Sequence, residues 1–285
     1  LKKNKTMIVD KKIKEFSELK KIAFKKKHTL LTIDQASTLK NSKISLIGDF
    51  QIKNLLMSIL AAKLCGLKKE KIMNVLKKIK NVNGRLELVR TLPNKSKVFI
   101  DYAHTPDALK TVLNSLNKNY NSKISLVFGC GGDRDKNKRK IMAKIAKSFC
   151  YKIYVTDDNP RRENPKKIRK MITKELTKAS YIEIGNRTRA IKYAIQNSEP
   201  SEIILIAGKG HETTQDYGKK IIKISDKSII KNTKVKKIRF SKEQCNKYFN
   251  SKILNSVINK NKEFKFKGVS INSKEVKKDN LFIAI

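Results

Sequence analysis

Between residues 98 and 207, short apolar segments alternate with segments of helical periodicity, and this alternation limits the possible fold more than any other feature of the chain. Strand-like apolar runs occupy 98–100, 124–128, 153–155, 181–184 and 203–207. Helical patterns lie between them, near 106–118, 137–149, 165–178 and 187–197. Short apolar strands separated by helices of this length are typical of βαβ units, in which helices cover both faces of a largely parallel sheet. The pattern predicts an α/β, Rossmann-like domain.

The segment before this alternation has a helical character. Apolar residues recur at three- and four-residue steps over 52–64, and Gly66 is placed for a C-cap. A second amphipathic helix is expected over 72–79. The sequence Asn-Gly-Arg at 83–85 predicts a turn and a domain boundary.

The pattern changes again after residue 232. An edge segment and a helix are expected over 239–259, a strand over 264–269, and an apolar strand-like run at 281–285. About fifty residues are too few to form a comfortable core alone, so this last segment is expected to be part of a larger domain. The predicted domains are therefore 1–83, 84–232 and 233–285.

The composition bears on several classes of protein. The formal net charge of +42 makes a basic nucleic-acid-binding protein one hypothesis. Against it, the lysines are spread evenly, aromatic residues make up 7% of the chain and tryptophan is absent, so we expect no nucleic-acid partner. No apolar run approaches the ~18 residues of a membrane span, no secretory signal is recognised, and the four cysteines lack metal-ligand spacing. We expect a cytoplasmic protein without membrane insertion.

Loops rich in glycine, charged residues and histidine follow four of the predicted strands. The first places Asp101 and His104 at a strand end, where they could bind the ribose or phosphates of a nucleotide. The simpler explanation is that Thr105 or Asp107 caps the next helix, with Pro106 near its first position. The two interpretations are compatible.

Two further loops are glycine-rich. Loop 129–135 has three glycines that let backbone amides approach a phosphate or carboxylate, and Arg134 adds a positive charge. Loop 208–212 reads Gly-Lys-Gly-His-Glu and lacks the spacing of a P-loop, which occurs nowhere in the chain. Tight turns without a ligand would account for either loop alone.

The most informative loop is 158–165, which reads Asp-Asn-Pro-Arg-Arg-Glu-Asn-Pro. A guanidinium there could hold a substrate carboxylate through two parallel hydrogen bonds. A proline-stopped turn with solvated arginines is the alternative. Because ligands collect beyond the carboxyl ends of parallel strands, four such loops together predict a ligand site at that edge of the sheet.

At these residues the chain resembles the Mur ligases of peptidoglycan synthesis, and among them the MurE type. The resemblance covers residues 5–230 and is specific in order, spacing and strand-end placement. It is carried by Gly48-Asp49-Phe50 with Asn54, Gly84-Arg85-Leu86-Glu87, Asp101-Tyr102-Ala103-His104-Thr105-Pro106-Asp107, Gly131-Gly132-Asp133-Arg134-Asp135, Asp158-Asn159-Pro160-Arg161 and Gly208-Lys209-Gly210-His211-Glu212.

The resemblance implies an ATP-dependent amide ligase that adds meso-diaminopimelate to UDP-MurNAc-L-Ala-D-Glu. ATP would phosphorylate the substrate carboxylate, and the incoming amine would attack the acyl phosphate through a tetrahedral oxyanion. Lysine-adding relatives lack a match to Arg161, since a lysine side chain offers no carboxylate. The residues implied near ATP are Asn54, Arg85, Asp101 and His104. Those implied for diaminopimelate are Arg134, Asp158, Asn159, Pro160, Arg161, Gly208 and Glu212, with Arg161 on its carboxylate and Glu212 on an ammonium.

The resemblance also implies a domain plan. Residues 1–83 would be the end of a central ATP-binding domain, and 84–232 a Rossmann-like C-terminal domain. Residues 266–285 resemble the opening strands of the MurF type, although Asn272-Ser273-Lys274 departs from the usual Asp-Ser-Arg or Asp-Thr-Arg.

We therefore expect an internal fragment of a MurE–MurF fusion. Its P-loop and Mg²⁺ ligands would lie before Leu1, and it would be inactive alone. A non-catalytic nucleotide-binding remnant is a further alternative.

Overall fold

The structure, a computed structural model, describes residues 5–33 and 46–235, and beyond them four short strands within 238–282. Its contacts divide the chain into two compact units, Leu1–Val82 and Asn83–Ile285. Each unit is described by itself below.

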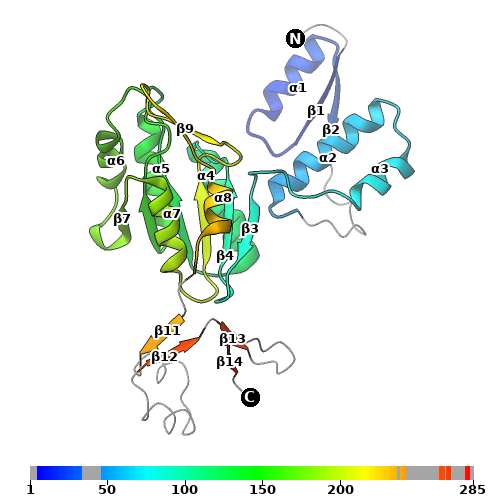
Figure 1. The fold of residues 1–285 in the computed structure, drawn as a ribbon. Coiled ribbons are helices and arrows are strands. Elements are labelled where there is room, and N and C mark those ends of the chain that lie inside the picture. Colours follow the sequence, from blue (N-terminus) through cyan, green and yellow to red (C-terminus); the bar gives the residue numbers. More distant parts are fainter. Residues whose placement is uncertain are drawn as a thin grey trace. The chain divides into compact units, whose positions relative to one another are not determined.

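The second unit is built around a six-stranded sheet with the strand order β3-β4-β8-β5-β6-β7 (Figure 1). The strands are β3 (Glu87–Thr91), β4 (Lys97–Asp101), β5 (Ile124–Phe128), β6 (Lys152–Val155), β7 (Tyr181–Glu183) and β8 (Ile203–Ala207). Neighbours from β4 to β7 are parallel, and in this sheet only the edge strand β3 is antiparallel to its neighbour. The predicted α/β class with a largely parallel sheet is therefore confirmed.

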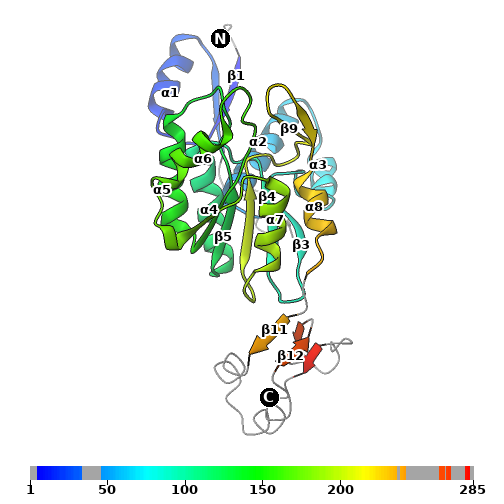
Figure 2. The same cartoon turned by 60° about the vertical axis from the view of Figure 1, so that its left-hand side comes forward.

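Helices cover both faces of this sheet. They are α4 (Pro106–Tyr120), α5 (Asn137–Phe149), α6 (Pro165–Thr173), α7 (Arg187–Gln196) and α8 (Asp226–Asn232). α4, α5 and α6 lie side by side on one face, and α7 and α8 cover the other, as the two views in Figures 1 and 2 show. Every residue of β5 and β8 is buried, as expected for central strands of a parallel sheet packed on both sides.

The ends of these helices follow local rules in part. Thr105 caps α4, its Oγ1 accepting a hydrogen bond from the Ala108 amide at 3.3 Å, and Pro106 is the first helical residue. α6 ends at Thr173 instead of reaching 178, because backbone hydrogen bonds of turns replace the helical ladder there. Lys178–Ser180 forms a separate 3₁₀ turn.

Three strands of this unit were not predicted. β3 (Glu87–Thr91) is an edge strand with charged residues at two positions, and β9 (Thr214–Asp216) and β10 (Ile221–Lys223) form a short hairpin. None is a buried apolar run: β10 is exposed along its whole length, and β3 and β9 each contain exposed residues. Each pairs with a strand a few residues away along the chain, β3 with β4 and β9 with β10.

The first unit contains β1 (Thr6–Val9), α1 (Phe16–Lys25), β2 (Thr29–Thr32), α2 (Asp49–Leu64) and α3 (Lys69–Leu76). β1 and β2 are parallel neighbours. α2 and α3 are the two helices predicted in this region, although α3 ends before Ile79. Gly66 follows α2 with a φ of +81°, which suits its predicted place at the helix end. Leu55 and Ile59 of α2 pack against Ile72 and Leu76 of α3.

The strands beyond residue 235 form two pairs. β11 (Ile238–Ser241) is antiparallel to β12 (Glu263–Phe266), and β13 (Gly268–Ser270) is parallel to β14 (Asn280–Phe282). The predicted strand over 264–269 corresponds to β12 and β13. The predicted helix reaching Asn259 and the sequence 272–274 lie outside the described residues.

Candidate functional site

A cavity of about 420 Å³ opens at the carboxyl edge of the sheet. Its walls come from the loops after β4, β5, β6 and β8, which are neighbours because β8 lies between β4 and β5. Seven of the residues predicted from the sequence line it: His104, Arg134, Asp158, Asn159, Arg161, Gly208 and Glu212. The structure also adds Tyr102, Asp135 and Lys138 to the lining.

The remaining predicted residues lie elsewhere. Arg85 lies in the turn before β3, Asp101 is the last residue of β4 and Pro160 is in the loop after β6, and none of the three lines the cavity. Asn54 is an exposed residue of α2, and α2 belongs to the first unit.

Asp101 is buried and binds the backbone. Its Oδ2 accepts a hydrogen bond from the Leu86 amide at 2.6 Å, and its Oδ1 accepts one from the Ala103 amide at 2.7 Å. Burial raises the pKa of Asp101, although these two hydrogen bonds and the charge of Arg85 act in the opposite direction. Asp101 thus ties the turn that carries Arg85 to the loop that carries Tyr102.

Tyr102 is the centre of a group of aromatic and cationic side chains. The Arg85 guanidinium lies over its ring, 4.3 Å from the centroid. The ring centroids of His104 and His211 lie 4.7 and 5.6 Å from that of Tyr102. His104 also makes a 2.9 Å hydrogen bond between its Nδ1 and the Tyr102 carbonyl oxygen. Such a group can stack on a planar heterocycle and contact anionic oxygens.

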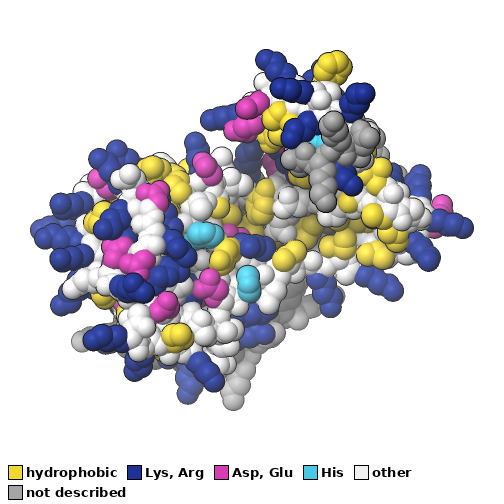
Figure 3. Space-filling model, turned by 90° about the horizontal axis from the view of Figure 1, so that it is seen from above, with side chains coloured by type: hydrophobic (Ala, Val, Ile, Leu, Met, Phe, Trp, Pro, Cys, Tyr) yellow, Lys and Arg dark blue, Asp and Glu magenta, His cyan; other side chains and the backbone are white. Residues whose placement is uncertain are grey.

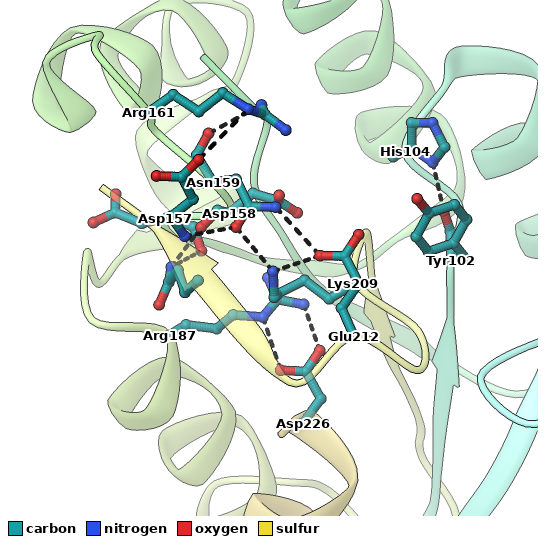
Figure 4. Close-up of polar contacts among 12 residues, drawn as sticks. Tyr102, His104, Asp157, Asp158, Asn159, Arg161, Arg187, Lys209, Glu212 and Asp226 are labelled. Carbon is teal, nitrogen blue, oxygen red and sulfur yellow. Dashed lines mark hydrogen bonds and ion pairs between the residues drawn. The ribbon is translucent and has the colours of Figure 1, made fainter. Parts of the chain in front are cut away.

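The loop after β6 places Arg161 at the cavity wall (Figure 4). Arg161 has a φ of +53°, unusual for a residue with a side chain. Its amide donates to the Asp216 carbonyl at 2.9 Å, and its Nη1 donates to the Gly132 carbonyl at 2.9 Å. Hydrogen bonds on both the backbone and the side chain therefore hold this guanidinium in one position.

Lys209 is a buried residue beside the cavity lining that was not predicted from the sequence, as Tyr102, Asp135 and Lys138 were not. Its side chain is 1% exposed, and its Nζ donates to Glu212 Oε2 at 2.8 Å and to Asn159 Oδ1 at 3.0 Å (Figure 4). Burial alone would raise the pKa of Glu212, but the hydrogen bond and charge of Lys209 outweigh it and hold this pKa below its ordinary value. The available signal was a lysine between two glycines directly after a fully apolar strand.

A buried ion pair lies close enough to the cavity wall for its arginine to interact with the charges of Asp158 and Glu212. Arg187, the first residue of α7, donates to both carboxylate oxygens of Asp226 in α8, at 2.9 and 2.7 Å, and also to the Ala207 carbonyl at 3.0 Å. The side chains of the pair are 0% and 1% exposed. Figure 4 draws the pair together with Lys209 and Asp158. Sequence periodicity carried no signal for a contact between residues so far apart.

Asp158 has an oxygen without a partner. Its Oδ2 is buried and finds no hydrogen-bond donor among the described residues. A Cβ atom at Gly208 would lie 2.5 Å from this oxygen, and Gly208 has a φ of +113°, so both space and conformation require glycine there. An unpaired buried carboxylate oxygen in a cavity wall suits a cationic group of a ligand.

No group of three or more His, Cys, Asp or Glu side chains in the described residues is close enough to hold a metal ion. None of the described helices has the length and apolar character needed to cross a membrane.

Comparison with known proteins identifies a family that matches part of the chain. Residues 84–210 match the family described as Mur ligase, glutamate ligase domain. They therefore form a Mur ligase C-terminal domain. The chain is 46% identical over 186 residues to the UDP-N-acetylmuramoyl-L-alanyl-D-glutamate–2,6-diaminopimelate ligase of Rickettsia bellii. This match covers 65% of the chain and 38% of the relative, so the chain spans about two fifths of that protein's length.

Solved structures show the same fold. A UDP-N-acetylmuramoyl-L-alanyl-D-glutamate–2,6-diaminopimelate ligase matches with a TM-score of 0.53 and 26% identity, over 80% of this chain and 53% of that one. A bifunctional folylpolyglutamate synthase/dihydrofolate synthase from Yersinia pestis, in complex with AMPPNP and a Mn ion, matches with a TM-score of 0.58 and 16% identity, over 73% and 51%.

Proposed function

We propose that this chain is part of an ATP-dependent ligase that joins meso-diaminopimelate to UDP-MurNAc-L-Ala-D-Glu through an acyl phosphate. The observation that carries the proposal is the charge pattern of the cavity, in which two arginines and an unpaired carboxylate oxygen lie in the wall of one space. The names of the relatives support the same reaction. Because the chain spans only part of those relatives, the activity belongs to the whole enzyme.

Diaminopimelate matches this pattern at both of its ends. Each end carries a carboxylate and an ammonium group on one carbon. In the proposal, Arg161 binds the carboxylate of the distal end through its planar guanidinium, and Arg134 supplies a second positive charge in the same cavity. L-Lysine has no distal carboxylate, so its binding would leave Arg161 without a partner.

The distal ammonium has two candidate acceptors. Glu212, proposed from the sequence, already shares its Oε2 with Lys209 and Asn159. Asp158 Oδ2 has no partner in the described part of the chain. We therefore assign the ammonium to Asp158 and assign Glu212, together with Lys209, to the orientation of Asn159.

The group around Tyr102 is the proposed nucleotide contact. Arg85 and His104 could approach phosphate oxygens, while the Tyr102 ring offers a face for stacking. Asp101 supports this group through the backbone instead of touching ATP. A Mg²⁺ ion would neutralise the phosphates when bound, and the described residues hold no carboxylate cluster for it, so its ligands are proposed to lie in other parts of the enzyme.

The proposal is tested by isothermal titration of the 285-residue chain with meso-diaminopimelate and with L-lysine. We expect binding of meso-diaminopimelate and at least a tenfold weaker response to L-lysine, since a buried charge partner rejects a ligand that lacks its counterpart. Arg161→Ala should abolish this preference and leave the circular dichroism spectrum unchanged. Equal affinity for both ligands, or binding that is insensitive to Arg161→Ala, would contradict the proposal.

The same 285-residue chain can be used to test the alternative of nucleic-acid binding. Lysine and arginine side chains are spread over the face shown in Figure 3 and do not gather in one stripe. A nucleic-acid-binding protein would bind duplex or single-stranded DNA with an affinity that falls steeply with salt and ignores Arg161. We expect no such affinity at 0.15 M salt.

We also propose that the chain comes from a fusion of MurE-type and MurF-type ligases, which rests on the sequence resemblance of residues 266–285. The fragment is expected to bind ligands without turnover. Sequencing the reading frame on both sides tests this proposal. In-frame P-loop motifs upstream and downstream would support it, and stop codons close to either end would overturn it.

A further inference from the structure

Arg139 is a fully buried arginine outside the cavity lining. It lies in the first turn of α5, and its side chain is 0% exposed. Its Nη1 and Nη2 donate to the two carboxylate oxygens of Glu163 at 3.0 and 2.8 Å, and Nη2 also donates to the Gly131 carbonyl at 3.1 Å. One guanidinium thus contacts both the loop after β5 and the loop after β6.

Glu163, in the loop after β6, also binds the backbone of the loop after β5. Its Oε1 accepts a hydrogen bond from the Asp133 amide at 2.7 Å, and Asp133 has a φ of +53°. The hydrogen bond and charge of Arg139 hold the pKa of Glu163 below its ordinary value. The carboxylate therefore binds a strained position of the neighbouring loop while it neutralises the buried arginine.

The same two loops touch closely along their backbones. The Gly132 amide donates to the Asn159 carbonyl at 2.9 Å. A Cβ atom at Gly132 would lie 1.9 Å from the Pro160 carbonyl oxygen, so the loops approach as near as glycine allows. Arg134 is two residues from Gly132, and Arg161 donates to the Gly132 carbonyl. The position of each cavity arginine therefore depends on how these loops are joined.

We propose that the Arg139–Glu163 pair is a positioning pair that sets the separation of Arg134 and Arg161, and through it the preference for a ligand with two carboxylates. The inference rests on the proposed function, which supplies the two arginines with their ligand. Arg139 and Glu163 do not touch the ligand, because neither lines the cavity. Their effect is exerted on the two loops.

A purely structural role is the competing explanation, and a double replacement separates the two. Removing one partner of a buried pair leaves an uncompensated charge and destabilises the protein. Replacing both by apolar residues of similar volume often restores stability. Arg139→Met/Glu163→Leu should therefore fold, but it cannot donate to the Gly131 carbonyl or accept from the Asp133 amide.

The experiment compares the parent chain, Glu163→Gln and Arg139→Met/Glu163→Leu by thermal unfolding and by titration with meso-diaminopimelate and L-lysine. We expect the double variant to unfold within a few degrees of the parent, while its affinity for meso-diaminopimelate falls at least about tenfold and its affinity for L-lysine changes little. Recovery of both stability and the parent preference in the double variant would overturn the inference.

Hydrogen exchange measured without a ligand gives a second, independent readout. In the double variant the amides of Asp133 and Arg161 should exchange faster than in the parent, whereas amides of β5 should not. Unchanged exchange at Asp133 and Arg161 would overturn the positioning role whatever the ligand is. A parent chain that binds no meso-diaminopimelate but shows this exchange pattern would instead count against the proposed function alone.

Discussion

The two halves of the cavity wall are built in different ways. The half formed by the loops after β5, β6 and β8 holds its polar groups through buried, compensated charges, of which Lys209 with Glu212 and Arg187 with Asp226 are the clearest. The half formed by the loop after β4 uses exposed His104 and a cation over the Tyr102 ring. The first arrangement gives a fixed geometry suited to selecting one small charged ligand, and the second tolerates adjustment around a planar one.

The largest effect should come from breaking the buried pair of Arg187 and Asp226. Arg187→Met leaves Asp226 buried without a partner, and we expect the free energy of unfolding to fall by about 3–5 kcal/mol. Urea unfolding measures the change. The matched control is Lys123→Met in the exposed pair with Glu199, where we expect a loss of about 0–1 kcal/mol. Equal losses of stability in the two variants would mean that the buried pair contributes no more to stability than the exposed one.

A smaller effect is expected at the glycine that faces Asp158. Gly208→Ala places a Cβ against Asp158 Oδ2 at a φ of +113°, and we expect about 1–3 kcal/mol of destabilisation with at least a tenfold loss of affinity for meso-diaminopimelate. Gly66→Ala is the control, since Gly66 also has a positive φ but nothing lies within 4 Å of an added Cβ. It should lose only stability, by about 1 kcal/mol. Retained ligand affinity in Gly208→Ala would show that the first half can adapt.

Replacing Arg85, which lies over the Tyr102 ring, and Arg161, in the loop after β6, tests whether the two halves act separately. Arg85→Gln removes the cation over Tyr102, and we expect about a fivefold loss of affinity for a fluorescent adenine nucleotide, or about 1 kcal/mol, with diaminopimelate binding unchanged. Arg161→Gln should show the reverse pattern. Fluorescence anisotropy and calorimetry measure the two affinities. Loss of both ligands in either variant would show that the halves do not act separately.

The smallest effect concerns pH. The pKa of Glu163 is held below its usual 4.5 in the folded protein, so its contribution to stability is present above that value and is lost as the pH falls through the folded pKa. The pKa of Asp101 is raised above 3.8 by burial, so Asp101 favours the folded state as the pH falls. We therefore expect Glu163→Gln to lose less stability than the parent between about pH 5 and 3, and Asp101→Asn to lose more. Urea unfolding at several pH values in this range measures the free energy of unfolding. If the two carboxyl groups do not differ, this free energy will change with pH at the same rate in both variants.

Much of the second unit was predictable because its signals are local. The apolar run at 203–207 is long enough and apolar enough to indicate a buried strand, and it is β8 residue for residue. Thr105 followed by Pro106 predicted the start of α4 from capping chemistry alone. The placement of Asp158 and Arg161 was likewise readable, because the loop that carries them follows an apolar run.

The rest depended on partners that the pattern of residues within one segment does not reveal. Asp101 is predicted from the sequence to lie near ATP, and the structure adds that its side chain accepts two backbone amides, one of them fifteen residues away in the sequence. β3 has no apolar pattern of its own and is stabilised by pairing with β4. Short polar strands of this kind are read correctly only when the neighbouring strand is known.

Local sequence signals are sufficient for the α/β class, for the order of β4 to β8 and the helices between them, and for the polar loops that follow four of these strands. Hydrophobic periodicity, helix capping and glycine conformations act over a few residues, so they are visible in the chain. The tertiary structure alone decided that β8 lies between β4 and β5, that Lys209 is buried between Asn159 and Glu212, and that Arg139 meets Glu163. Such contacts arise from burial, and burial of a charged side chain depends on where its opposite charge lies in the folded protein.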